Sequence, residues 1–99
     1  MTASEDNPVY LIVNQIPLGH VMTYGQIAAL APGQTARMVA RALKNTPEDT
    51  RLPWHRVVSA GLKIADFPGW QVQEKRLREE GVCFRRERSI DKRHHWMPQ

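Results

Sequence analysis

The chain has 99 residues, a formal net charge of +4 and a sequence pI of about 9.7, and its length suits one small domain over residues 1–99. Its one cysteine, Cys83, excludes an internal disulfide, and the histidines are not spaced with it as a zinc finger or ribbon requires. No apolar run could cross a bilayer, and the acidic start MTASEDNPVY lacks the layout of a signal peptide. We therefore expect a cytoplasmic protein with no membrane segment, no metal and no cofactor.

Positive charge is concentrated near the C-terminus. From residue 84 onward the chain reads FRRERSIDKRHHWMPQ, a basic tail that we expect to run extended along the surface. Such a surface attracts nucleic acid or anionic membrane, although it can also serve only solubility. The tail has no apolar helical face, which argues against the membrane.

The segment DNPVYLIVNQI predicts a first helix. Asn7 can cap its N-terminus, and Pro8 suits the first turn, where its missing N–H is not needed. Pro17 should end it. The apolar residues at helical spacing, expected to face the core, are Val9, Ile12, Val13 and Ile16.

Two further helices follow on either side of a Pro-Gly turn. Thr23 and Gln26 have the spacing of a capping box, so a helix should begin at Tyr24, and Thr35 should cap the next helix over 36–45. The predicted apolar positions are Ile27, Ala28 and Leu30 in the first and Met38, Val39, Ala42 and Leu43 in the second, which Asn45 and Pro47 should close. The pair is typical of a helix-turn-helix, although an ordinary helical hairpin has the same pattern.

The second of these helices has a face of small and cationic residues. Its members are the small Ala36, Ala40 and Ala42 and the cationic Arg37, Arg41 and Lys44. Major-groove readers present long polar side chains to base edges, whereas a small face with flanking charge suits close docking in the minor groove. The alternative is that alanine is here only as the best helix former.

The C-terminal half predicts a short strand and one more helix. RVV reads as a strand, SAG as a turn and ADFPGW as a loop. QVQEKRLREEGV then predicts a helix with a weak apolar stripe, ended by Gly81.

Four motifs in order point to a known family. IPLGHVMTYGQIA, TARMVARALKN, PWHRVV and KRLREEGV, within residues 9–82, resemble the C-terminal domain of O6-alkylguanine-DNA alkyltransferases. The resemblance implies an α/β, mainly helical domain of winged helix-turn-helix type. We expect a monomer, because no heptad pattern or large apolar face indicates an oligomer.

One departure from the family changes the expected function. Alkyltransferases carry Pro-Cys-His-Arg, in which the cysteine accepts the alkyl group, and here Trp54 fills the cysteine's place. An indole cannot replace the thiolate nucleophile. This is similar to the alkyltransferase-like proteins, which bind O6-alkylguanine without repairing it. The resemblance therefore implies a damage sensor with no catalytic residue, bound to double-stranded DNA that contains O6-alkylguanine and flagging it for nucleotide excision repair proteins.

The resemblance also assigns roles in base flipping. Tyr24 matches the tyrosine that presses on the phosphate backbone, although a residue at a helix start can also serve packing alone. Arg37 matches the arginine that enters the base stack, since a guanidinium both stacks and donates several hydrogen bonds; a phosphate contact is the alternative. Arg41 and Lys44 should touch phosphates or water.

A lesion pocket is expected around Trp54, with residues Pro53, Trp54, His55, Val57 and Phe67. Trp54 offers apolar surface for the alkyl group, and Phe67 could stack on the flipped base. The other readings are a core aromatic for Trp54 and loop packing for Phe67. His55 and Glu80 match two members of the alkyltransferase relay and should form a structural pair, with Arg56 in an internal ion pair or on the backbone.

Two rival functions stay open. An alkyltransferase activity would have to use Cys83, which lacks the Pro-His context. A winged-helix transcription regulator would read undamaged sequence through the major groove and would not need Trp54.

Overall fold

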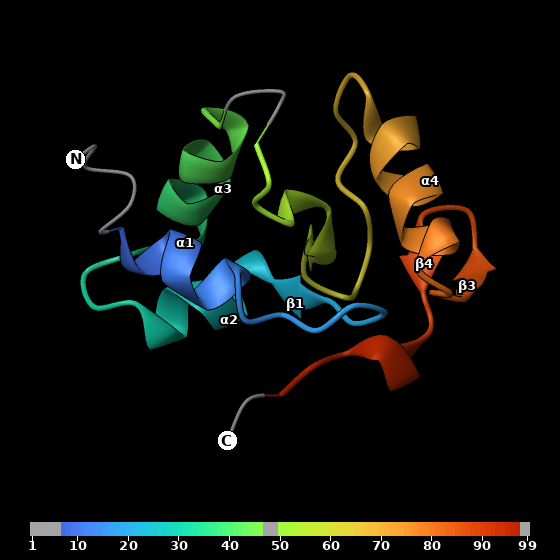
Figure 1. Cartoon of the computed structure of the whole chain (residues 1–99), viewed down its shortest axis with the longest axis horizontal. Helices are drawn as coiled ribbons and strands as arrows, with labels where there is room; N and C mark the ends of the chain where they lie inside the picture. Colours follow the sequence, from blue (N-terminus) through green and yellow to red (C-terminus); the bar gives the residue numbers. More distant parts are fainter. Residues whose placement is uncertain (1–6, 47–49, 98–99) are drawn as a thin grey trace.

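The computed structural model describes residues 7–46 and 50–97, and helices dominate it (Figure 1). Its elements in chain order are α1 (Pro8–Val13), β1 (Met22–Thr23), α2 (Tyr24–Leu30), α3 (Ala36–Lys44), the 3-10 helix η2 (Trp54–Arg56), β2 (Val57–Val58), α4 (Trp70–Glu79), β3 (Phe84–Arg86), β4 (Ser89–Ile90) and the 3-10 helix η3 (Lys92–His94). Among these described residues, no helix has the length and apolar character needed to span a bilayer.

Side-chain caps begin α1, α2 and α3 where the sequence predicts them. The Asn7 side chain accepts a hydrogen bond from the Val9 N–H at 2.9 Å, and Thr35 caps α3 at 3.2 Å. Thr23 and Gln26 form the complete capping box of α2, with bonds of 3.1 and 3.3 Å. Each cap satisfies an N–H that the first helical turn leaves without a partner, which is why these starts are visible in the sequence.

Two predicted core positions are wrong, because Leu30 is 49% exposed and Met38 45% exposed. Ile12, Ala28 and Ala42 are half-buried and pack against the buried core. The buried stripes of α2 and α3 instead follow Ile27 with Ala31, and Val39 with Leu43. Leu30 and Met38 each precede a buried residue by one position, which turns them about 100° away from the core. Pro47, predicted to close α3 together with its C-cap Asn45, lies outside the described residues.

The basic tail is not extended as predicted. β3 and β4 pair antiparallel, with Phe84 opposite Ile90, and Arg88 has the positive φ of 61° that the tight turn needs. Ile90 is buried in the core, which gives the hairpin its apolar anchor. The chain then returns past β1, where Val21 forms a parallel bridge with His95.

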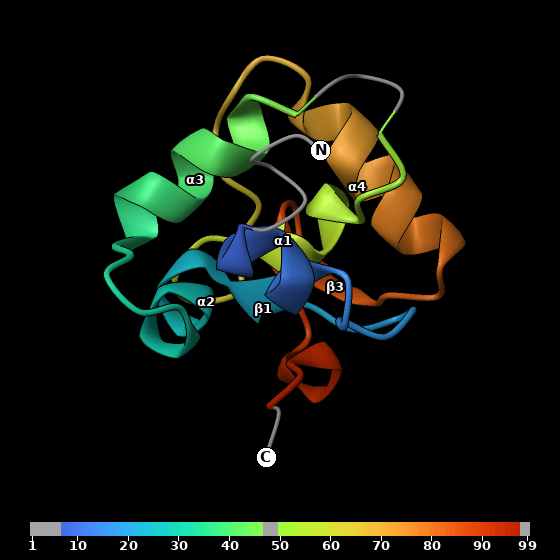
Figure 2. The ribbon, with the colours of Figure 1, turned by 60° about the vertical axis from the view of Figure 1, so that its left-hand side comes forward.

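The core has two clusters joined by the parallel pair β1–β2. Val57 faces the first cluster, with α1, α2 and α3, and Val58 faces the second, with Leu77 of α4 and Ile90. Successive strand residues point to opposite faces, so one short strand can serve both clusters. η2 directly precedes β2 in the chain. Figure 1 and the rotated view in Figure 2 show that it lies between α3 and α4.

α4 has little apolar surface, as the sequence predicts. Its buried positions are Gln73 and Leu77, one turn apart, while Val72 is exposed. Gly81 follows the helix with φ of 87°, the left-handed conformation expected of a residue just past a helix C-terminus.

Candidate nucleic-acid interface

The exposed face of α3 carries three cations. Arg37, Arg41 and Lys44 are exposed, and within residues 7–46 and 50–97 none of them forms an ion pair. Between them, Ala36 is exposed and Ala40 half-buried, so no bulky side chain stands in front of the helix backbone. An uncompensated cationic helix face with small residues is suited to close approach by a phosphate backbone.

Tyr24 is the first residue of α2 and lies half-buried at the edge of the first core cluster. Burial raises the pKa of its phenol, which stays neutral near pH 7. The capping box fixes the backbone on which this tyrosine is carried.

The returning tail adds support that the sequence reasoning missed. Gln26 Nε2 donates to the Trp96 carbonyl at 2.6 Å, and His95 Nε2 lies 2.7 Å from Gln26 Oε1. The capping-box pattern indicates only the local half of this role, because the tail residues are about 70 positions away in the chain.

Trp54 is half-buried on η2 and has one aromatic and one cationic neighbour. The His55 ring stands perpendicular to the indole, with centroids 6.1 Å apart. From α4, the guanidinium carbon of Arg76 lies 5.4 Å from the centre of the indole ring. Trp54 therefore packs on the first core cluster and also contacts the helix that the second cluster holds in place.

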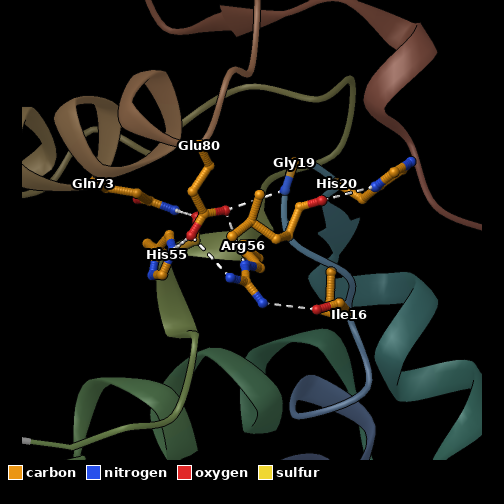
Figure 3. A network of polar contacts seen from close by, with 8 residues as sticks. Ile16, Gly19, His20, His55, Arg56, Gln73 and Glu80 are labelled. Carbon is orange, nitrogen blue, oxygen red and sulfur yellow. Dashed lines mark hydrogen bonds and ion pairs between the residues drawn. The ribbon is translucent and has the colours of Figure 1, made fainter.

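Glu80 brings η2, α4 and the loop before β1 together (Figure 3). Its carboxylate accepts from His55 Nε2 at 2.7 Å and from Arg56 at 3.0 and 2.9 Å. The Gly19 N–H donates to it at 3.3 Å, and Arg56 also donates to the Ile16 carbonyl at 2.8 Å. The side chains of His55, Arg56 and Glu80 are 11, 16 and 13% exposed. The network thus braces the Pro-Trp-His-Arg segment from three directions.

The charge states in this network follow from burial and hydrogen bonding. Burial alone would raise the pKa of Glu80, but hydrogen bonds from Arg56, His55 and the Gly19 N–H hold it at about 2. Burial lowers the pKa of His55, and its bond to Glu80 only partly opposes that effect. His55 is therefore neutral at pH 7, donates through Nε2 to Glu80, and has its lone pair on Nδ1.

Gln73 is a second brace that the sequence reasoning missed. It is 1% exposed, and its Nε2 donates to the carbonyls of His55 at 3.0 Å and Val57 at 2.8 Å. Its place one turn before Leu77, on the weak apolar stripe of α4, is the signal that it is buried.

Two of the predicted pocket residues, Val57 and Phe67, pack with the core clusters. The Val57 side chain is fully buried in the first cluster, so it anchors β2 to the core and does not line an open pocket. Phe67 packs on the second cluster beside Trp70, at a hollow of about 390 Å³ lined by residues 66–71. Within the described residues it makes no aromatic contact with Trp54. The loop 59–69 carries Phe67 toward α4, because Leu62 and Ile64 anchor it in the second cluster.

Cys83 is exposed and belongs to a different group of contacts. Arg93 donates to its sulfur at 2.7 Å, and its N–H donates to His94 Nε2 at 3.0 Å. Within the described part of the chain, none of the hydrogen bonds of Cys83 reaches the His55–Glu80 network. In residues 7–46 and 50–97 no three potential metal ligands gather at one point.

A helix-turn-helix with a cationic second helix, beside a braced tryptophan segment, defines a DNA-binding domain. The model of the family described as "6-O-methylguanine DNA methyltransferase, DNA binding domain" matches residues 5–82. The chain belongs to this family.

Curated relatives and solved structures agree with this assignment. The chain is 43% identical over 91 residues to the Escherichia coli "DNA base-flipping protein", covering 89% of this chain and 70% of that protein. It is 42% identical over 78 residues to "Alkyltransferase-like protein 1" of Schizosaccharomyces pombe, covering 75 and 72% of the two chains. The crystal structure of the S. pombe protein with damaged DNA containing O6-carboxymethylguanine superposes with a TM-score of 0.86 at 36% identity, over 99% of this chain and 100% of that one. The expected family and fold are confirmed.

Proposed function

We propose that this chain is a damage sensor that binds O6-alkylguanine in double-stranded DNA and leaves the alkyl group in place. The observation that carries the proposal is Trp54, which stands in the family's Pro-Cys-His-Arg segment where the nucleophile would be, while His55 and Glu80 keep their hydrogen bond. A relative named for base flipping and another crystallised with damaged DNA support the same function.

Binding would begin at α3. Arg41 and Lys44 contact phosphates, while the small face at Ala36 and Ala40 lets the helix enter the minor groove. A base inside the duplex cannot be inspected, so the modified guanine is rotated out at a cost of a few kcal/mol, roughly. Tyr24 presses on the backbone beside the extruded nucleotide.

Arg37 then fills the gap in the stack. It is exposed on the first turn of α3, and its planar guanidinium can stack on neighbouring bases while it donates to the base left without a partner. The extruded guanine is received beside the half-buried indole of Trp54, with Pro53 and His55 on either side of it in the chain.

The site lacks the means to transfer the alkyl group. An indole supplies no thiolate, so the His55–Glu80 pair has nothing to activate and serves as a brace. Cys83 is held by Arg93 and His94, outside this network. A bound and unrepaired lesion persists, which suits a monomeric, cytoplasmic sensor that hands it to nucleotide excision repair proteins.

The test is a paired titration at fixed salt. Two duplexes identical except for one O6-methylguanine are bound by the wild-type chain and by Trp54→Ala, and the methyl group is assayed afterward. Preference for the lesion with the methyl group intact, reduced in Trp54→Ala, supports the proposal. Equal binding to both duplexes contradicts it and favours a transcription regulator. Loss of the methyl group contradicts the absence of chemistry, and Cys83→Ser then shows whether that thiol is responsible.

A further inference from the structure

Arg76, in the KRLREEGV segment of α4, is a cation beside the proposed pocket. Its guanidinium carbon lies 5.4 Å from the centre of the Trp54 indole, and the residue is half-buried. Within residues 7–46 and 50–97 its side chain makes no hydrogen bond and no ion pair. All of its N–H donors are therefore available to a ligand that settles against the tryptophan.

Arg78, two residues further on α4, provides the contrast. It pairs with Glu74 at 3.4 Å, and its guanidinium lies 4.4 Å from the centre of the Phe84 ring. Residues two apart on a helix do not share a face. Of these two arginines, Arg76 is the one that contacts Trp54 and has no acidic partner in the described chain.

His55, the neighbour of Trp54 in the chain, has a second unused polar group. The residue is 9% exposed, its Nε2 bonds to Glu80, and its Nδ1 is buried without a hydrogen-bond partner among the described residues. A buried polar atom without a partner costs free energy that a bound ligand or water can recover. Arg76 and His55 thus offer a charged donor and a neutral acceptor next to one aromatic surface.

The balance of charge at Trp54 is positive. The one nearby carboxylate of the network, Glu80, already accepts from Arg56, His55 and the Gly19 N–H. Arg76 is close enough to His55 to contribute to its lowered pKa. An anion that entered here would meet an uncompensated guanidinium in a partly desolvated place, where charge-assisted hydrogen bonds are strongest.

We propose that Arg76 determines specificity, favouring O6-alkylguanines whose substituent ends in a carboxylate. This inference rests on the proposed function and names the lesion class that the site prefers. A planar guanidinium can bind a carboxylate through two parallel hydrogen bonds, whereas a methyl or hydroxyethyl group meets only the apolar indole and a neutral partner. The S. pombe relative crystallised with O6-carboxymethylguanine makes that adduct the natural probe.

The experiment compares four duplexes that differ in one base: guanine, O6-methylguanine, O6-(2-hydroxyethyl)guanine and O6-carboxymethylguanine. Wild type, Arg76→Gln, Arg76→Lys and the control Arg78→Gln are titrated with each at fixed salt, after circular dichroism has verified their fold. We expect Arg76→Gln to lose about tenfold in affinity for the carboxymethyl duplex, as the loss of a charged hydrogen bond implies, and less than about twofold for the two neutral adducts. Arg78→Gln removes the same charge from the same helix and should leave the ratio of affinities unchanged, while Arg76→Lys should keep part of the preference.

The outcomes separate the two proposals. If wild type binds all four duplexes equally, the sensor function fails, and the specificity role fails with it. If wild type prefers lesions but Arg76→Gln weakens binding to every duplex by the same factor, Arg76 is a general DNA contact and only the specificity role is overturned. If wild type prefers lesions but binds the carboxymethyl and hydroxyethyl adducts equally, the specificity role of Arg76 is also overturned, while the sensor function stands.

Discussion

Replacing Glu80 by glutamine should destabilise the chain near neutral pH and matter much less in acid. The carboxylate accepts from His55, Arg56 and Gly19, and a side chain only 13% exposed is little screened by solvent. A pKa lowered from 4.5 to about 2 corresponds to about 3 kcal/mol of folding free energy. Glutamine keeps one acceptor oxygen but turns its NH₂ toward the donors of Arg56, so most of this stabilisation should be lost.

The sign of the pH dependence follows from the direction of the shift. A carboxyl whose folded pKa is depressed binds protons more readily when the chain is unfolded, so its contribution is complete above about pH 4.5 and declines as the pH falls toward about 2. Urea unfolding of wild type and Glu80→Gln at several pH values measures it. The two curves should differ by about 3 kcal/mol near pH 7 and converge in acid.

A matched control is Glu79→Gln, which changes the neighbouring, exposed carboxylate on the same helix. It should leave the free energy of unfolding within about 0.5 kcal/mol of wild type. Equal stability of wild type and Glu80→Gln near neutral pH would refute the reasoning, as would a difference that stays constant down to the acid limit.

Three further predictions concern single residues. Gln73→Leu removes the side-chain donor from the carbonyls of His55 and Val57 and should lower the free energy of unfolding by about 2–4 kcal/mol in urea titrations, whereas the exposed control Gln71→Leu should have little effect. Arg41→Ala should reduce the slope of log affinity against log salt by about one, and an unchanged slope would exclude a phosphate contact. His55 should titrate below its ordinary pKa of 6.5 and carry its proton on Nε2 at neutral pH; NMR of the imidazole nitrogens that found Nδ1 protonated would contradict this arrangement.

Short-range features of the fold were predictable. The starts of α1, α2 and α3 depend on hydrogen bonds between residues two or three apart, so Asn7, Thr23 and Thr35 identify them in the sequence. The order of the motifs indicated the family, and the proximity of His55 to Glu80 came with that resemblance.

The placement of the tail and of Phe67 could not be predicted from the sequence, because it depends on which segments pack together in the folded chain. The composition of the tail predicts a charged surface segment, whereas in the structure β3 pairs with β4 and Ile90 is buried in the core. Phe67 lies at a distance along the chain that suits the pocket, yet its loop is anchored on the second cluster.

The sequence by itself determined the helix starts, the cationic face of α3 and the tryptophan in place of a nucleophile, because each of these is a matter of residue type or of spacing within one turn. Only the tertiary structure decided that Gln73 bonds to the carbonyls of η2 and β2, and that Arg76 lies over Trp54. Both contacts join residues about twenty positions apart, and they form because Leu77, buried in the second cluster, holds this face of α4 against the core. Burial selects that face, and burial belongs to the packed molecule as a whole.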